Sequence, residues 1–265
     1  MTSLPAGTSR CPDALINLAD RLADAAAAAI RPYWRTPFPV DIKADASPVT
    51  AADRDAEMAM RRIVAAERPD HGMIGEEFGA ERDDATYVWV FDPIDGTKAF
   101  MTGKPTFGTL IALLEDGVPI LGVIDQPIVG DRWIGAVGHR TLLNGVETGP
   151  RSCPTLARAV ITTTAPDLFD DAAYRAFRTV ADQCAVRVYG GDCTNYGLLA
   201  SGFVDVVIEN GLKLHDFAAL VPVIDGAGGL LVDWQGAPLR RGSDGTVLAL
   251  GDRSLLAPCL EILSQ

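Results

Sequence analysis

The sequence predicts a layered protein of helices and strands whose two halves are built differently. The first half contains four apolar, strand-like runs, at residues 87–91, 107–114, 118–125 and 131–137. The last three follow one another through short links that contain Gly or Pro, which predicts an antiparallel meander. In the second half, strand-like runs alternate with helical stretches, a pattern that favours layered α/β structure. We therefore expect an α+β protein with an antiparallel-rich first half and an α/β second half.

The elements expected in the second half alternate along the chain. Strands are predicted at about 158–163, 185–189, 203–209, 229–234 and 246–250. Helices are predicted at 171–183, 193–201, 216–227 and 253–263. Pro222 should kink or break the third of these helices. The pattern changes near Gly149-Pro150-Arg151, so we expect an N-terminal lobe over residues 1–150 and a C-terminal lobe over residues 151–265.

Two helices are predicted in the first half. The first covers residues 13–35, with alanines that permit close packing on a sheet and with one apolar stripe formed by Leu15, Leu18, Leu22, Ala26, Ala29 and Tyr33. The second begins near Thr50 and has apolar residues at helical spacing, which puts Asp53 in its first turn. Thr50 and Asp53 also have the spacing of a capping box, so Asp53 has a purely structural explanation as well.

Composition and charge disfavour several classes of protein. The chain has 265 residues with 48% hydrophobic and 22% charged side chains, which is typical of a globular protein with a sizeable core. The formal net charge of -12 disfavours nucleic acid and anionic membranes as partners, because these are bound through Lys and Arg. Five cysteines without Cys-x-x-Cys spacing indicate neither a disulfide framework nor a zinc site. No apolar run is long enough to span a bilayer, and we expect a soluble, cytoplasmic protein.

The strongest functional signal is the segment 87–97, an apolar strand that runs into Asp92 and Asp95. A proline between them turns the chain so that both carboxylates can aim to one side, and such oxygens are the hard ligands that Mg²⁺ takes. Gly96 has no Cβ, so a phosphate could approach the main chain there, and Thr97 can donate to that anion. The segment predicts a metal and phosphate site. An acidic β-turn is the simpler alternative, since Asp-Pro and Asp-Gly are common turn dipeptides.

Other acidic groups lie before and after this segment. Glu76 and Glu77 follow a short apolar segment. Further along the chain, Glu209 precedes Asp216, which begins another apolar segment. Each group has a structural explanation when taken alone. Two adjacent glutamates are usually a solvated charge pair, and Asp216 has the place of a helix N-cap.

Taken together, these motifs resemble the inositol monophosphatase superfamily of Mg²⁺-dependent phosphomonoesterases. The resemblance runs from about residue 43 to about residue 234 and rests on Gly75-Glu76-Glu77, Asp92-Pro93-Ile94-Asp95-Gly96-Thr97, the later Asp216 and Gly226-Ala227-Gly228-Gly229. With Tyr189-Gly190-Gly191-Asp192-Cys193, the chain most resembles histidinol-phosphate phosphatases of the inositol-monophosphatase type. The resemblance implies a five-layer α-β-α-β-α sandwich. It also implies a homodimer, which is usual for such enzymes.

The resemblance further implies a site that binds two or three Mg²⁺ ions. Glu76, Asp92 and the carbonyl of Ile94 would hold the first ion. The second ion would be held by Asp92, Asp95 and Asp216, which makes Asp92 the bridging ligand. Paired metals of this kind stabilise both the attacking and the leaving oxygen of a displacement.

Water is the nucleophile that the resemblance implies. Asp53, accepting from the Thr97 hydroxyl, would orient that water with help from Glu76 or Glu77. The N–H groups of Gly96 and Thr97 would bind the phosphoryl oxygens. A different phosphatase class, with an aspartyl nucleophile, carries an Asp-x-Asp signature, and the two aspartates of this segment are one residue too far apart for it.

Substrate recognition would fall to residues outside the metal set. Asp192 and Glu209 would accept from the ammonium and imidazole groups of L-histidinol phosphate, an intermediate of histidine biosynthesis. Glu209 would equally accept from an inositol hydroxyl, so inositol-1-monophosphatase or another small sugar or nucleotide phosphatase is the alternative. Lys43 is a further site candidate, and His215 stands where a tryptophan is common in the family. Residues 190–192 also have a purely structural explanation, in which they form a turn into a helix that Asp192 caps.

A non-enzymic, metal-dependent binding protein on the same fold is the third functional alternative. Such a protein would be expected to have lost a metal ligand or the water-orienting pair. Asp53, Thr97 and all the expected carboxylates are present in this sequence, which favours the enzyme.

Overall fold

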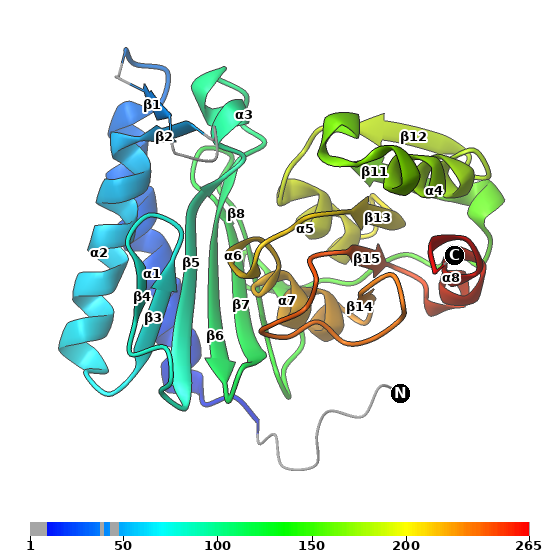
Figure 1. Ribbon diagram of the computed structural model, residues 1–265. Coiled ribbons are helices and arrows are strands. Elements are labelled where there is room, and N and C mark those ends of the chain that lie inside the picture. Colours follow the sequence, from blue (N-terminus) through cyan, green and yellow to red (C-terminus); the bar gives the residue numbers. More distant parts are fainter. Residues whose placement is uncertain (1–9, 38–39, 43–47, 265) are drawn as a thin grey trace.

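Helices and sheets alternate in five layers in the computed structural model, which describes residues 10–37, 40–42 and 48–264 (Figure 1). The outer face of the first sheet is covered by α1 (Asp13–Ile30) and α2 (Ala51–Glu67). Between the two sheets lie α5 (Thr194–Ala200), α6 (Leu214–Phe217) and α7 (Leu220–Ala227). The second sheet is covered by α4 (Asp171–Ala181) and α8 (Leu256–Leu263). The predicted α-β-α-β-α sandwich is confirmed.

The first sheet has eight strands in the order β10-β9-β8-β7-β6-β5-β3-β4. They are β3 (Gly72–Gly75), β4 (Gly79–Glu81), β5 (Tyr87–Asp95), β6 (Gly108–Glu115), β7 (Val118–Gln126), β8 (Asp131–Ala136), β9 (Leu142–Leu143) and β10 (Val146–Glu147). Strands β6 to β8 form the predicted antiparallel meander, β5 pairs with β6 in the same sense, and β3 pairs with β5 in parallel. A separate hairpin pairs β1 (Val40–Ile42) with β2 (Pro48–Thr50).

Strand β5 is apolar on both faces because it is buried on both. Trp89 and Phe91 pack under α1 and α2, whereas Val88 and Val90 face the middle helices. A strand between two helical layers reads as a continuous apolar run instead of an alternating one. Because β5 is buried on both faces, its last residues, which include Asp92 and Asp95, lie between the sheet and the middle helical layer.

The second sheet has five strands in the order β12-β11-β13-β15-β14. They are β11 (Val160–Thr163), β12 (Val186–Tyr189), β13 (Val206–Glu209), β14 (Leu230–Val232) and β15 (Val247–Leu250). Strand β11 is parallel to β12 and β13, and β15 is antiparallel to β13 and β14, so the sheet is mixed. The first sheet ends with β10 and the second begins with β11, but helices of the middle layer pack on both. A division into lobes at residue 150 stays a prediction.

Prolines set two helix boundaries. The first predicted helix ends as an α-helix at Ile30 and continues as a 3-10 turn over Arg31–Tyr33, because Pro32 has no N–H for the helical ladder. The predicted helix 216–227 is split into α6 and α7. Pro222 cannot donate to the carbonyl of Ala218, which lies in the gap, so the expected break is confirmed. The remaining short helices are α3 (Thr97–Met101) and 3-10 turns at Leu156–Arg158, Pro166–Leu168 and Arg253–Leu255.

Helix α7 lies directly against the backbone of the first sheet. A Cβ added at Gly122 on β7 would lie 1.9 Å from the carbonyl oxygen of Ala219, and one at Gly135 on β8 would lie 2.3 Å from that of Pro222. The two glycines are cross-strand partners. Only glycine permits so close an approach, and it fixes the depth at which α6 and α7 sit on the sheet.

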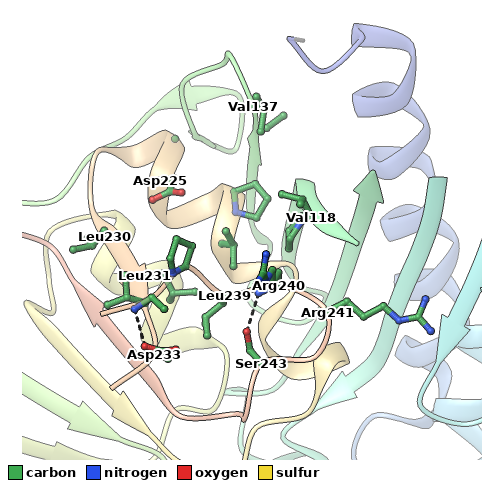
Figure 2. A pocket seen from close by; sticks show the side chains of 18 of the residues that line it. Val118, Val137, Asp225, Leu230, Leu231, Asp233, Leu239, Arg240, Arg241 and Ser243 are labelled. Atoms are coloured by element: carbon green, nitrogen blue, oxygen red, sulfur yellow. Dashed lines mark hydrogen bonds between the residues drawn. The ribbon is translucent and has the colours of Figure 1, made fainter. Parts of the chain in front are cut away.

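A cavity of about 890 Å³ opens at the far end of β7 from the Asp92–Asp95 segment (Figure 2). Its lining mixes the apolar side chains of Val118, Val137 and Leu231 with Asp225 and Arg240. In Figure 2 the Asp225 carboxylate comes from α7. The predicted site residues are not among the residues that line this cavity.

No helix in the described parts of the chain is long and apolar enough to cross a lipid bilayer. All five cysteines carry free thiols, in agreement with the expectation that they form no disulfide framework.

The close approach of α7 to the sheet yields a test of packing. We expect Gly122→Ala to lower the free energy of unfolding by about 1–3 kcal/mol, because its methyl group would overlap the Ala219 carbonyl. Gly149→Ala is the matched control, since its added Cβ would come no closer than 3.2 Å to another group, the Ala227 carbonyl. Urea unfolding measures both. Equal stability of Gly122→Ala and wild type would contradict the packing.

Candidate metal centre

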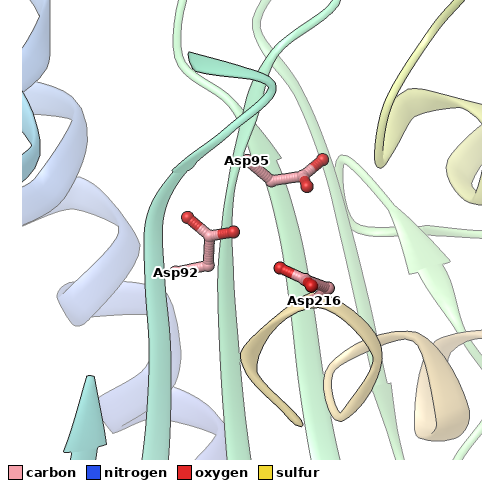
Figure 3. A group of neighbouring side chains, drawn as sticks. All are labelled: Asp92, Asp95 and Asp216. Atoms are coloured by element: carbon pink, nitrogen blue, oxygen red, sulfur yellow. The ribbon is translucent and has the colours of Figure 1, made fainter. Parts of the chain in front are cut away.

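Two aspartates at the end of β5 and one on α6 form an acidic cluster. Carboxylate oxygens of Asp92, Asp95 and Asp216 all lie within 4.8 Å of one another. Figure 3 shows the three side chains converging between the end of β5 and the short helix α6. The cluster therefore joins the first sheet to the middle helical layer.

An irregularity in β5 lets both of its aspartates face the cluster. In a regular strand, side chains three positions apart point to opposite faces of the sheet. Here Asp92 pairs with Leu110 and Asp95 with Gly108, so three steps on β5 match two on β6. A bulge of this kind re-aims side chains, and it includes Pro93, which has no N–H to give to the ladder.

Each carboxylate of the cluster has one oxygen bound by a main-chain N–H group. Asp92 Oδ1 accepts from Ile94 at 3.1 Å, and Asp95 Oδ2 accepts from Cys193 at 2.6 Å. Asp216 Oδ2 accepts from Lys213 at 2.7 Å in a capping box at the start of α6. Asp216 is therefore not the N-cap that the sequence suggested, because Lys213 holds that position; Asp216 lies three residues further on and binds the N-cap N–H with one oxygen. These bonds orient the carboxylates and leave a second oxygen on each.

Burial and mutual repulsion raise the pKa values of the cluster. Burial raises the pKa of Asp92 well above its usual range, and the charges of Glu76, Asp95 and Asp216 raise it further. Burial also raises the pKa of Asp95 and that of Asp216, where nearby His215 opposes the shift. An acidic, all-oxygen donor set suits a hard divalent cation such as Mg²⁺, which would offset the repulsion. The residues present therefore fit the metal that the sequence predicts.

Glu76 lies beside the three-aspartate cluster. It is half-buried at the end of β3, where its N–H donates to the carbonyl of Phe91 at 3.2 Å. Besides burial, the charge of Glu76 raises the pKa of both Asp92 and Asp53, so its carboxylate is close enough to repel both of them. The Ile94 carbonyl is buried below the cluster and accepts from the Thr97 hydroxyl at 3.1 Å. Their roles as metal ligands stay predictions.

The structure gives Asp53 and Thr97 different hydrogen-bond partners from those predicted. Asp53 Oδ2 accepts from the N–H of Thr50 at 2.8 Å and from its hydroxyl at 2.5 Å, which confirms the capping box. The Thr97 hydroxyl donates to the Ile94 carbonyl, one turn back along its own segment. Local partners satisfy both side chains, so the expected Asp53–Thr97 bond is not the one they make. Burial raises the pKa of Asp53, the residue expected to act on water.

A loop that follows β12 of the second sheet packs against Gly96, in the segment predicted to bind phosphate. Gly190, Gly191 and Asp192 all have positive φ, at 91°, 117° and 46°. A Cβ added at Gly96 would lie 2.8 Å from Asp192 Cγ, so this glycine makes room for the carboxylate. Burial raises the pKa of Asp192 to about 6, against the opposing charges of nearby lysines. The residue does not cap α5, whose N-cap position is Cys193.

Glu209 ties two parallel strands together at their carboxyl ends. It is buried at the end of β13, where Oε1 accepts from the N–H of Thr164 at 2.7 Å and Oε2 from the hydroxyl of Thr163 at 3.1 Å. Burial raises the pKa of Glu209 to about 7, and the charge of Asp192 adds to the shift. Its carboxylate is therefore already bound within the protein.

Two polar groups near the cluster were missed by the sequence analysis. Asn195 Nδ2 and Tyr196 Oη are buried and make no hydrogen bond within the described residues. Burial raises the pKa of Tyr196 well above its usual range, and the nearby charges of Glu209, Asp95 and Asp216 raise it further. Both residues lie in the first turn of α5, a short helix with a mostly apolar sequence. No spacing pattern in the sequence distinguishes them as site residues. Lys43, another predicted candidate, lies outside the described residues.

Known proteins resemble this chain over most of its length. The profile of the inositol monophosphatase family matches residues 12–262. The bifunctional phosphatase IMPL2, chloroplastic, of Arabidopsis thaliana is 55% identical over 226 residues, which are 84% of this chain and 65% of that protein. A histidinol-phosphatase of Mycobacterium tuberculosis is 36% identical over 204 residues, covering 74% of this chain and 78% of its own.

The fold has equally clear counterparts. A solved inositol monophosphatase from Zymomonas mobilis superposes with a TM-score of 0.89 at 50% identity, covering 96% of this chain and 98% of that one. A solved inositol monophosphatase from Thermotoga maritima superposes with a TM-score of 0.85 at 22% identity, which supports the fold alone. With the family profile, the five-layer fold and the acidic cluster all present, the chain belongs to the inositol monophosphatase family of phosphatases.

Proposed function

We propose that the protein is a Mg²⁺-dependent phosphomonoesterase that hydrolyses L-histidinol phosphate to L-histidinol and phosphate. The observation that carries the proposal is the convergence of Asp92, Asp95 and Asp216, each with one oxygen held by a main-chain N–H. Glu76, Asp92 and the Ile94 carbonyl are the proposed ligands of one ion, and the three aspartates those of a second. A third ion is compatible with the same acidic surroundings.

The bound ions would stabilise charge on the phosphoryl group and make the attacking water more acidic. The main-chain N–H groups of Gly96 and Thr97 are proposed to bind the phosphoryl oxygens. Asp53, with Glu76 or Glu77 nearby, is proposed to orient the water and accept its proton. The water oxygen bonds to phosphorus, the bond from phosphorus to the ester oxygen breaks, and the released alkoxide takes up a proton to become the alcohol.

The choice of L-histidinol phosphate rests on Asp192. This carboxylate lies against Gly96, so it would meet the group that an ester carries next to its phosphate. The substrate has a cationic amine, for which a partly buried carboxylate is a suitable acceptor. A relative named histidinol-phosphatase shares 36% of the aligned residues.

An inositol phosphate is the second candidate substrate. It is favoured by the high similarity to the Zymomonas mobilis inositol monophosphatase and by Glu209, whose carboxylate has lone pairs left to accept from a hydroxyl. A non-enzymic binding role is the weaker alternative, since the full set of carboxylates is kept.

We also propose that the protein is a cytoplasmic homodimer. Strand β12 is the edge of the second sheet and exposes Val186, Val188 and Tyr189, which an unpaired edge strand seldom leaves in water. The free thiols suit a reducing compartment. Sedimentation as a monomer at micromolar concentration would contradict the dimer.

Asp92→Asn tests the metal site. We expect Mg²⁺-dependent turnover of histidinol phosphate to fall by at least about 10²-fold, because the bridging ligand loses its charge. In excess chelator the variant should melt above wild type, because one of the mutually repelling carboxylates is gone. Phosphate release and thermal melting measure the two effects. Asp70→Asn, the same change at an exposed position, is the control. Wild-type turnover in Asp92→Asn would refute the metal mechanism.

Asp192→Asn tests the substrate. A charge-assisted hydrogen bond contributes roughly 1.5–3 kcal/mol, so we expect kcat/KM for histidinol phosphate to fall roughly 10- to 150-fold. Turnover of a small uncharged phosphomonoester should stay nearly unchanged. Steady-state kinetics on both esters separates recognition from catalysis. Equal losses on the two would assign Asp192 to the fold or the metals, and a wild-type preference for inositol phosphate would favour the second candidate.

Glu209→Gln tests the state of that buried carboxyl. Its pKa is raised when folded, so the protonated form stabilises the fold; this contribution is present below about pH 4.5 and is lost as pH rises through about 7. The free energy of unfolding of the metal-free protein should fall by roughly 2–3 kcal/mol from this group over that range. An amide can keep both hydrogen bonds, so the variant should show a flatter profile. Glu147→Gln, the same change at an exposed position, should leave the profile unchanged.

A further inference from the structure

Helix α2 buries a row of charged side chains on the face that meets the turn after β3. Asp53, Glu57 and Arg61 recur every fourth residue and are 1%, 0% and 8% exposed. Charged side chains are almost never buried this fully without partners. Asp53 is satisfied by its capping box. The partners of the other two lie on the segment that carries Glu76.

Glu57 binds the main chain of that turn. Its Oε2 accepts from the N–H of Glu77 at 2.8 Å, and its Oε1 accepts from the N–H of Phe78 at 3.2 Å. The same Oε1 accepts from Arg61 Nε at 2.7 Å, which supplies the countercharge. A Cβ added at Gly75 would lie 1.8 Å from Glu57 Oε1, so only glycine leaves room for the carboxylate.

Arg61 completes the attachment at the other end of the turn. Its guanidinium donates to the carbonyl of Gly79, the first residue of β4. Gly79 pairs with Gly75 across the hairpin, so both ends of the turn are fixed. Helix α2 thus binds three consecutive residues, 77–79, through two buried side chains of opposite charge.

Glu76 is held on both sides by these contacts. Its own N–H donates to Phe91 on β5, and the next N–H, that of Glu77, donates to Glu57. We propose that Glu57 and Arg61 are positioning residues that fix the 76–79 turn and so hold the Glu76 carboxylate beside Asp92. The inference rests on the proposed function, because it takes Glu76 as a metal ligand. Groups that orient metal ligands typically contribute 10- to 100-fold to metal affinity.

The test uses Glu57→Gln in the full chain. The amide keeps the volume of the side chain but offers one acceptor oxygen in place of two, so one of the two N–H groups loses its acceptor. Hydrogen exchange of the metal-free protein should become faster in residues 76–79. The affinity for Mn²⁺, followed by electron paramagnetic resonance, should fall about 10-fold or more. The Mg²⁺ concentration for half-maximal turnover should rise by the same factor, with KM for the ester nearly unchanged at saturating Mg²⁺.

Two further variants keep the test decisive. Glu67→Gln removes another carboxylate of α2, one that pairs with Arg21 at the surface, and it should change neither exchange in the turn nor Mn²⁺ affinity. Arg61→Lys keeps a positive charge beside Glu57 but loses the planar donor to Gly79, so a smaller effect in the same direction is expected. If Glu57→Gln does not fold, the measurements on Arg61→Lys decide.

The outcomes separate this inference from the proposed function. Unchanged exchange and unchanged Mn²⁺ affinity in the folded variants would overturn the positioning role. A loss of thermal stability alone, with both quantities at wild-type values, would also overturn it and assign the pair to the fold. Failure of the wild-type protein to bind Mn²⁺ would instead overturn the proposed function, whatever the turn does.

Discussion

Repulsion among buried carboxylates is the constraint on which the rest of the structure depends. Asp92, Asp95 and Asp216 approach one another although burial and like charge both oppose it. Their positions are imposed from outside the cluster, by a bulge in β5 and by main-chain donors from three segments. Strain and like-charge contacts of this kind persist only where the surrounding structure fixes them, and they are typical of functional sites.

The surrounding layers hold the cluster in place largely through contacts of the backbone. Gly122 and Gly135 let α7 lie against the sheet, and Pro222 accompanies the break between α7 and α6, the helix that carries Asp216. On the opposite side, the ion pair of α2 holds the turn that carries Glu76. The acidic cluster and Glu76 are thus held from several layers at once, which explains why their carboxylates come from distant parts of the sequence.

Much of this could be predicted from the sequence, and the exceptions have physical reasons. Strands β6 to β8 are long, apolar and joined by short turns, and the motif around Asp92 combines an apolar strand with two carboxylates, a proline and a glycine. The parallel pairing of β3 with β5 was not foreseen, because four residues carry too little periodicity. Glu57 and Arg61 look like an exposed i,i+4 pair in sequence, and only the fold buries them. The partner of the Thr97 hydroxyl was wrong because a nearer carbonyl satisfies it.

The bond from the Cys193 N–H to the Asp95 carboxylate attaches the loop that contains Asp192 to the acidic cluster. Any residue other than proline at position 193 could donate it. Thr194, the residue after Cys193, adds to this attachment, because its hydroxyl accepts from Gln126 and donates to the Thr106 carbonyl. Under the proposed function, a substitution of Asp192 changes which ester is accepted and leaves these attachments in place. With this arrangement, substrate preference can change during evolution with little effect on the hydrolytic step. One fold can therefore support several activities.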